Sequence, residues 1–187
     1  MRVIAGIAKG RTLVPPRGTA TRPATDRIRE ALFAILEPSL GDARALDLFA
    51  GAGTLGIEAL SRGAAHATFV ERSSDALAAL RRNLRATGFA DRSDIVPANV
   101  LAYLERSVAA PYDVVFCDPP FADVAVLEAV LTRLPAAGAL AADAIVVARV
   151  LKKHRPALPV GVTLTRTKEI GEEALLFLRY DAAGGGG

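Results

Sequence analysis

The sequence of 187 residues has few of the residue types that mark metal sites and disulfide-bonded proteins. Cys117 is its one cysteine, so no disulfide can form within the chain, and a reducing, cytoplasmic setting is expected. His66 and His154 lie far apart in the sequence, with no cysteine or acidic residue at metal-ligand spacing. We therefore expect no metal site.

Long hydrophobic runs are also missing. The longest candidate, residues 136–150, is broken by Gly138 and Asp143 and falls short of the roughly 18 apolar residues of a membrane span. Residues 1–6 are too few and turn polar too soon for a signal peptide. We expect a cytoplasmic protein with no membrane partner, and a monomer, because no additional apolar face is evident.

Positive charge is concentrated in two segments, although the net charge is only +3. Residues 1–30 carry seven lysines and arginines against two acidic residues, and residues 149–168 carry six against none. The remainder is therefore acidic. If the two basic segments meet in space, they form a rim for nucleic-acid phosphates; if they do not, they are solvated faces at both ends.

The length suits one α/β domain, and half of the residues are hydrophobic, enough for a sizeable core. Residues 1–22 are basic and rich in glycine and proline, and we expect a hairpin extension there, with strands 3–8 and 12–14. The main domain is expected to cover residues 23–181. Residues 182–187, which end in four glycines, are expected to form a flexible tail.

Strand and helix patterns alternate through the main domain. An apolar stripe predicts a helix over 25–37, with Thr25 or Asp26 as its N-cap. This alternation predicts a mostly parallel seven-stranded sheet with helices on both faces. The predicted strands are 45–49, 67–71, 94–97, 112–117, 144–150, 161–167 and 174–180, and the other predicted helices are 55–62, 74–86, 100–106 and 124–134.

A glycine-rich motif, G-x-G-x-x-G over residues 51–56, stands between the first predicted strand and its helix. Such a turn lets the backbone approach a nucleotide-like cofactor closely, but nicotinamide and flavin enzymes share it. Asp47 at the strand end discriminates, because its carboxylate would repel a pyrophosphate. It suits a cofactor with a cationic amino-acid end, such as S-adenosylmethionine (SAM). The alternative is an ordinary tight turn beside a solvated aspartate.

Two further polar residues follow predicted strands at the same edge of the sheet. Glu71 lies 20 residues after Gly51, where an acid can accept hydrogen bonds from both ribose hydroxyls, or can simply be exposed. Asn99 follows the third strand, where its amide could contact the adenine of the cofactor. It could equally cap the next helix.

The most specific motif is Asp118-Pro119-Pro120-Phe121, directly after an apolar strand. An aromatic exocyclic amine is a poor nucleophile because its lone pair is delocalised into the ring. Asp118 and the carbonyl of Pro119 could accept the amine protons and so favour a pyramidal nitrogen, with the prolines fixing the backbone. Phe121 could stack on a flipped base. The alternative is a proline-rich loop with a core phenylalanine.

Together these motifs resemble a known family. The run Arg-Pro-Ala-Thr-Asp-Arg-Ile-Arg-Glu-Ala-Leu-Phe at 22–33, the glycine motif, Ala-Leu-Ser-Arg-Gly at 59–63 and Asp-Pro-Pro-Phe are similar to those of the RsmD family, over residues 2–180. These are 16S ribosomal RNA guanine-N2 methyltransferases. The resemblance implies the Rossmann-like SAM-dependent methyltransferase fold and SAM as donor. It also implies guanine 966 of 16S rRNA as target, in the small ribosomal subunit or its assembly intermediate.

The resemblance and the charge pattern assign residues to three sites. The catalytic loop is Asp118, Pro119, Pro120 and Phe121; the cofactor site is Asp47, Phe49, Gly51, Gly53, Glu71, Arg72, Asn99 and Val100; and the RNA-binding residues are Arg2, Lys9, Arg11, Arg22, Arg27, Lys152 and Lys153. Arg27 and Arg29 could instead form the solvated face of their helix.

This sequence departs from the family pattern at two positions. Asn99 stands where related methyltransferases often carry Asp, and residues 147–149 lack the acidic residue that often ends the fifth strand, so no role is assigned to that strand end.

Three alternatives remain open. An amino-methyltransferase of DNA adenine or of a protein glutamine would usually carry Asn and Tyr in the catalytic loop. A nicotinamide-dependent oxidoreductase would share the glycine motif, but Asp47 and the lack of an evident hydride-site His or Tyr argue against it. The third is a non-catalytic RNA-binding module.

Overall fold

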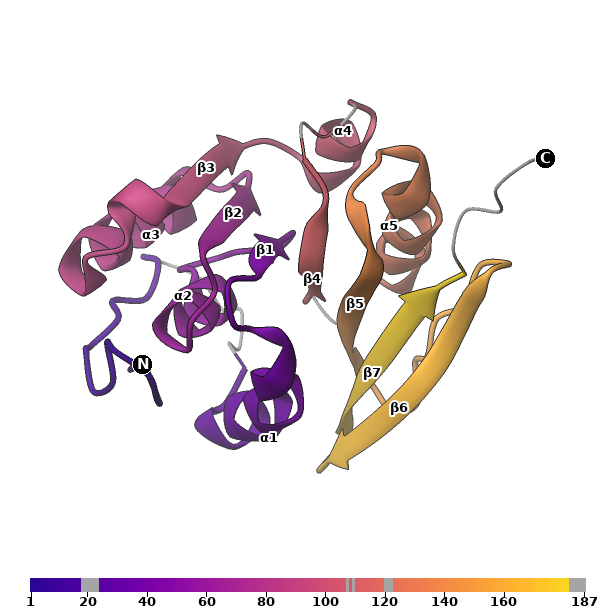
Figure 1. Cartoon of the computed structure of the whole chain (residues 1–187), viewed down its shortest axis with the longest axis horizontal. Helices are drawn as coiled ribbons and strands as arrows, with labels where there is room; N and C mark the ends of the chain where they lie inside the picture. The colour runs from indigo at the N-terminus through magenta and orange to yellow at the C-terminus, as the bar shows by residue number, and fades with distance from the viewer. Residues whose placement is uncertain (18–23, 107, 109, 120–122, 182–187) are drawn as a thin grey trace.

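The computed structural model describes residues 1–17, 24–106, 108, 110–119 and 123–181, and these form one seven-stranded sheet with helices on both faces (Figure 1). The strand order is β3-β2-β1-β4-β5-β7-β6. The strands are β1 (Arg44–Asp47), β2 (His66–Glu71), β3 (Ser93–Pro97), β4 (Tyr112–Cys117), β5 (Leu140–Leu151), β6 (Val162–Ile170) and β7 (Glu173–Tyr180). The α-helices are α1 (Asp26–Leu36), α2 (Thr54–Ser61), α3 (Ser74–Thr87), α4 (Val100–Leu104) and α5 (Val124–Ala136).

The strand directions confirm the predicted mostly parallel sheet. Strands β1 to β5 run parallel to their neighbours, and β7 lies antiparallel between β5 and β6. Several bounds differ from the prediction. The largest differences are in β5, which begins four residues earlier than 144–150, and β6, which ends three residues later than 161–167, while α4 ends two residues before the predicted 106. Residue 149 lies near the carboxyl end of β5, between β4 and β7.

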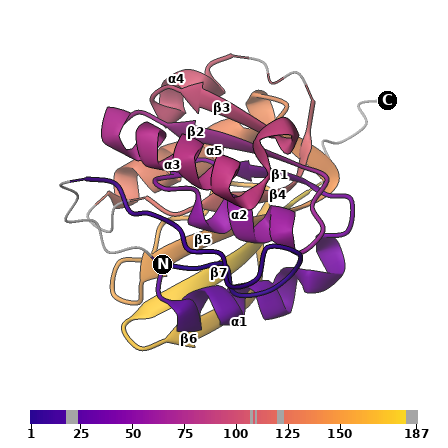
Figure 2. The same ribbon diagram turned by 90° about the vertical axis from the view of Figure 1, so that its left-hand side faces the viewer.

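The helices divide between the two faces. Helices α1, α2 and α3 cover one face and α4 and α5 the other (Figures 1 and 2). Because side chains alternate along a strand, Val114 and Phe116 of β4 pack with the first group, while Val115 and Cys117 pack with the second. Both faces of β4 are therefore buried, as its continuous apolar run predicted. Within the described residues, no helix is long and apolar enough to cross a membrane.

Local signals in the sequence set the helix ends. The hydroxyl of Thr25 accepts the N–H of Ile28 and caps α1, and Ser73 caps α3 in the same way. Gly88 ends α3 in the left-handed conformation, at φ 78°. The buried side of α3 includes Asn83, which donates to the carbonyl of Ala52 in the glycine-rich turn.

The expected N-terminal hairpin is present in a shorter form than predicted. Arg2 and Thr12 form an antiparallel bridge, and backbone hydrogen bonds join Val3 to Gly10 and Arg11 and Leu13 to Met1, but the pairing does not extend through residues 4–8. In residues 4–8, other acceptors take the backbone donors. The N–H groups of Ile4 and Ala5 donate to the carboxylate of Glu58 (2.8 and 3.0 Å), and that of Ile7 donates to the carbonyl of Ser61. The segment is therefore held by α2.

A buried charge cluster fastens this segment to α1 and α2. Glu58 is fully buried; it accepts a hydrogen bond from Arg62 Nε (2.8 Å) and lies 3.6 Å from Nη1 of Arg29. Arg29 is itself buried and donates to Asp26 (2.7 Å) and to the carbonyl of Arg2 (2.8 Å). The expectation that Arg29 lies on a solvated helix face is wrong, because its guanidinium is buried and neutralises an internal carboxylate.

Replacing Gly6 by alanine tests how tightly the segment is held. Gly6 has φ +80°, and a Cβ there would stand 1.8 Å from the carbonyl oxygen of Ser61. We expect Gly6→Ala to lower the free energy of unfolding by about 3 kcal/mol or more, from backbone strain plus overpacking. Gly10→Ala is the matched control: its φ is +83° with nothing within 4 Å, so the cost should be about 1 kcal/mol. Equal losses for both variants in denaturant titrations would contradict the tight contact.

Candidate active site

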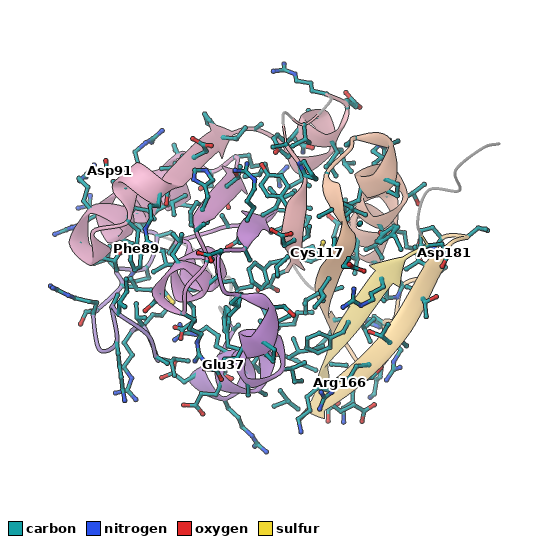
Figure 3. All side chains as sticks on the ribbon, viewed as in Figure 1. Glu37, Phe89, Asp91, Cys117, Arg166 and Asp181 are labelled. Carbon is teal, nitrogen blue, oxygen red and sulfur yellow. The ribbon has the colours of Figure 1, made fainter. Side chains whose placement is uncertain are left out.

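Four of the sequence-predicted site residues meet at the carboxyl edge of the sheet. Asp47 ends β1 and Glu71 ends β2, while Asn99 and Asp118 come one or two residues after β3 and β4. These strands are hydrogen-bonded neighbours and parallel, so their carboxyl ends lie side by side. Figure 3 labels Cys117, the residue before Asp118, near the middle of the molecule.

The three glycines of the turn have different jobs. Gly51 and Gly53 adopt positive φ of 53° and 85°, which residues with a Cβ rarely do. Gly56 lies in α2, where a Cβ would stand 2.3 Å from the ring of Phe69, so it allows the helix to approach β2. At Gly51 a Cβ would meet no atom within 4 Å, which leaves open space over the turn for a ligand.

Asp47 is buried beneath this turn, with 1% of its surface exposed. The N–H of Gly56 donates to its Oδ2 (3.1 Å), whereas its Oδ1 has no hydrogen-bond partner among the described residues. Burial raises the pKa of the Asp47 carboxyl to about 7, against the hydrogen bond from Gly56, and the charges of Asp118 and Glu71 raise it further. Such an oxygen is suited to receive a donor from a ligand.

Glu71 holds the turn in place. Its Oε2 accepts the N–H of Gly51 (2.8 Å), and its Oε1 accepts the N–H groups of Arg72 and Ser73 (both 2.8 Å). A carboxylate offers about four acceptor positions and three are used here, so about one remains for a ribose hydroxyl of the kind that the sequence predicts. The contact with Gly51 shows that Glu71 also shapes the loop, a role that the sequence did not indicate.

The remaining predicted cofactor residues surround this edge. The side chain of Asn99 accepts the N–H of Leu101 (2.9 Å) and caps α4, so the capping alternative is correct, and its amide NH₂ stays a predicted adenine contact. Phe49 is partly buried, Arg72 is exposed, and Val100 is buried at the start of α4.

Asp118 lies in an ion-paired cluster. Its side chain is 15% exposed, and its Oδ1 accepts a hydrogen bond from Nε of Arg149 at 2.6 Å. Nη1 of Arg149 donates to Glu173 Oε2 at 3.0 Å. Burial raises the pKa of the Asp118 carboxyl, while the guanidinium of Arg149 acts in the opposite direction. The other carboxylate oxygen of Asp118 has no hydrogen-bond partner in the described part of the chain.

A narrow hollow lies beside Asp118, between the start of α1 and the sheet. Its lining is apolar except for Asp118 and Arg149. Pro119, the next catalytic-loop residue, is buried, and Pro120 and Phe121 lie outside the described residues. The other lining residues are Ala24, Ile28, Leu32, Leu55, Phe116, Cys117, Val147 and Leu175.

The predicted RNA-binding residues are mostly on the surface. Exposed side chains are those of Arg2, Lys9, Arg11, Arg27 and Lys153, and Arg22 lies outside the described residues. Arg2 also approaches Asp26 at 3.6 Å. The second basic segment is partly neutralised, because Lys152 and Arg155 both pair with Glu169 (3.0 and 2.9 Å) and Arg149 is buried. In the described part of the chain no group of three His, Cys, Asp or Glu could hold a metal ion.

Three residues of the site were missed by sequence reasoning. Arg149 and Glu173 come from strands far from Asp118 in sequence, and no local pattern links them. Asn83 of α3 donates to the carbonyls of Ala52 and Val14 (2.9 and 3.0 Å), joining the glycine turn to the N-terminal segment. A lone asparagine on the apolar side of a helix was the available signal.

The buried carboxyl of Asp47 predicts a pH-dependent stability. Its pKa is raised from 3.8 to about 7 on folding, so the folded state favours the protonated carboxyl more than the unfolded state does. The stabilisation is therefore complete below about pH 4 and is lost as the pH rises through about 7, by up to about 4 kcal/mol. Denaturant unfolding of the ligand-free protein between about pH 5 and about pH 8 should show a decline that Asp47→Asn removes. The exposed Asp75→Asn serves as control, and an unchanged decline in Asp47→Asn would rule out this carboxyl as its source.

Asp47, the turn and Glu71 fit SAM chemically. The unpartnered Oδ1 of Asp47 suits an ammonium donor, the open space at Gly51 permits close approach, and Glu71 retains about one acceptor position for a ribose hydroxyl.

Comparisons with known proteins identify the family of this chain. The family described as Conserved hypothetical protein 95 matches residues 1–179. Ribosomal RNA small subunit methyltransferase D of Escherichia coli (strain K12) is 38% identical over 185 residues, which are 98% of this chain and 92% of that protein.

Two solved structures extend the comparison. The methyltransferase yhhF of Escherichia coli superposes with a TM-score of 0.87 at 37% identity, covering 97% of this chain and 98% of that one. An RNA methyltransferase from Salinibacter ruber in complex with S-adenosyl-L-homocysteine shares the fold, with a TM-score of 0.65 at 16% identity over 83% and 92% of the chains. This chain therefore belongs to the RsmD family of methyltransferases, and SAM is its cofactor.

Proposed function

We propose that this methyltransferase transfers the methyl group of SAM to the exocyclic N2 amine of one guanine in 16S rRNA, within the small ribosomal subunit or an assembly intermediate. The observation that carries the proposal is the position of Asp118. It follows β4 at the edge formed by Asp47 and Glu71, and one carboxylate oxygen is left without a partner among the described residues. The similarity to a small-subunit rRNA methyltransferase over nearly the whole chain supports the choice of RNA.

The protein's contribution to the reaction is to prepare the amine. SAM, when bound, supplies a methyl group on a sulfonium that makes it susceptible to attack. The partnerless oxygen of Asp118 and the carbonyl of Pro119 accept the two amine hydrogens, which draws the nitrogen lone pair out of conjugation with the ring. Positioning and polarisation of this kind need no covalent enzyme intermediate.

Asp118 also suits the proton that leaves after transfer. Burial raises the pKa of its carboxyl, so it is a better proton acceptor than a solvated aspartate, while Arg149 keeps the charged form accessible. The proton passes to water or transiently to Asp118.

The two basic segments adjoin α1, which supports a phosphate-binding rim. Arg2 lies within 3.6 Å of Asp26 at the start of α1, and a second hollow brings Ile28 of α1 together with Lys168 of β6. Both segments therefore reach the helix whose start flanks the hollow beside Asp118, so phosphates on either side of a flipped guanine could be held.

Methyl transfer to small ribosomal subunits is the direct test of this function. Subunits lacking their own guanine-N2 methylation are incubated with the protein and labelled SAM, and the product nucleoside is identified. We expect N2-methylguanosine in 16S rRNA. Label in duplex DNA or in protein, with none in the subunits, would instead favour adenine or glutamine methylation.

Removal of the Asp118 carboxylate should separate chemistry from cofactor binding. We expect Asp118→Ala to reduce methyl transfer by at least about a hundredfold, because the amine loses its charged acceptor, while the dissociation constant for SAM stays within about threefold. Calorimetric titration of SAM and a single-turnover assay measure the two quantities. Asp47→Asn is the contrasting variant, and its main effect should be on SAM affinity. Loss of SAM binding in Asp118→Ala would exclude the assigned role.

The proposed rim predicts a change in salt dependence. Lys9→Gln, Arg11→Gln and Lys153→Gln should each weaken subunit binding and reduce the slope of log affinity against log salt by about one, because each removes one phosphate contact. Arg85→Gln, on the exposed face of α3, is the control and should leave the slope unchanged. If only the control variant changes the slope, the RNA binds over α3.

A further inference from the structure

Arg149 occupies an unusual place for a charged side chain. It is the tenth residue of the twelve-residue β5, it is 8% exposed, and its neighbours along the strand are apolar. Its guanidinium joins two carboxylates, with Nε 2.6 Å from Asp118 Oδ1 and Nη1 3.0 Å from Glu173 Oε2. Both carboxylates are themselves only 15% exposed.

The register of the sheet creates this arrangement. Cys117 of β4 pairs with Ala148 of β5, so the next residues, Asp118 and Arg149, are adjacent. Leu151 of β5 pairs with Glu173 of β7, which puts Glu173 diagonal to Arg149 on the same face. The three side chains therefore form a row across β4, β5 and β7, with the ligand-facing carboxylate at one end.

Stability alone does not explain such a row. Burying a guanidinium and two carboxylates costs several kcal/mol per ion before pairing, and apolar residues of similar size often replace buried ion pairs without loss. The planar fork of arginine can hold two carboxylates in fixed directions, which a lysine cannot do. The row is thus better suited to orienting Asp118 than to holding the strands together.

The charges in the row oppose one another at Asp118. Burial raises the pKa of its carboxyl, the charge and hydrogen bond of Arg149 lower it, and the nearby charge of Glu173 raises it. Burial also disfavours charge on Arg149, but Asp118 and Glu173 outweigh this and raise the pKa of the guanidinium, so it stays protonated. Asp118 therefore has a permanently charged partner in Arg149, and the carboxylate of Glu173 weakens the effect of that charge on the pKa of Asp118.

We propose that Arg149 is a positioning residue for methyl transfer. It fixes Oδ1 of Asp118 so that the other oxygen faces the target amine, and it keeps the Asp118 carboxylate ionised. Glu173 moderates the influence of the Arg149 charge on Asp118. The proposal rests on the proposed function of Asp118. It assigns a role to the end of β5, where the sequence suggested none.

Substitution of Arg149 and substitution of Glu173 should shift the pH dependence of methyl transfer in opposite directions. In Arg149→Gln the pKa of Asp118 loses its main lowering influence, so the acid limb of the single-turnover rate should move up by about one unit or more, and the rate at neutral pH should fall by about tenfold or more. In Glu173→Gln the acid limb should move down. Arg149→Lys keeps a charge but not the fork, so the limb should stay near the wild-type position while the rate falls.

Controls distinguish this role from a structural one. Arg179→Gln on β7, which removes an exposed arginine bound to Asp143, should leave rate and limb unchanged. SAM affinity should be retained in every variant. A uniform fall in rate at all pH values, with no movement of the limb in either Arg149→Gln or Glu173→Gln, would overturn the proposal.

A measurement without substrate separates this proposal from the proposed function. The carboxyl of Asp118 is followed by NMR with isotope-labelled aspartate, assigned by its loss in Asp118→Asn, and titrated in the wild type, Arg149→Gln and Glu173→Gln. We expect the titration midpoint to rise in the first variant and to fall in the second. Should Arg149→Gln fail to fold, Glu173→Gln and Arg149→Lys decide. Unchanged midpoints would refute the electrostatic coupling, whereas absent methyl transfer by the wild type with shifted midpoints would refute only the assigned reaction.

Discussion

Buried carboxylates are the constraint on which the rest of this structure depends. Four carboxylates are fully or mostly buried: those of Asp47, Glu58, Asp118 and Glu173. Each needs hydrogen-bond donors, because an isolated buried charge costs too much free energy. The donors come from backbone N–H groups at Asp47 and from arginines at Asp118 and Glu173, and Glu58 uses both. These contacts determine where the N-terminal segment, the glycine turn and β5 can lie.

The local parts of the site could be predicted because their signals are contiguous in the sequence. The glycine turn, the acids at strand ends and the Asp118 motif each follow an apolar strand, and parallel neighbours bring strand ends together. The helix caps at Thr25 and Ser73 are equally local.

The errors came from partners that are distant in sequence. Helical periodicity places Arg29 on the polar side of α1. It cannot show that this side packs against the buried carboxylate of Glu58 in α2 instead of facing solvent. The sequence suggested a hairpin with strands 3–8 and 12–14, but it could not show that the pairing would stop short because the same Glu58 takes two of the backbone donors. Arg149 was read as part of a surface charge run, because its contact with Asp118 depends on the register of β4 and β5. The register is set by the packing of the whole sheet, so it cannot be predicted from the sequence of either strand alone.

The fold contains an arginine–carboxylate cluster at Glu58 and another at Asp118. The two differ in how many carboxylate acceptor positions remain without a protein donor. At Glu58 one oxygen accepts from Ala5 and Arg62, and the other accepts from Ile4 and faces Arg29, so both are occupied by protein donors. At Asp118 one oxygen is held by Arg149, and the other has no partner within the described residues. A saturated cluster can only join elements of the fold. A cluster that immobilises one oxygen and leaves the other open can direct the open oxygen at a ligand, and this difference, more than burial or charge, supports the proposal that Asp118 is the reactive carboxylate.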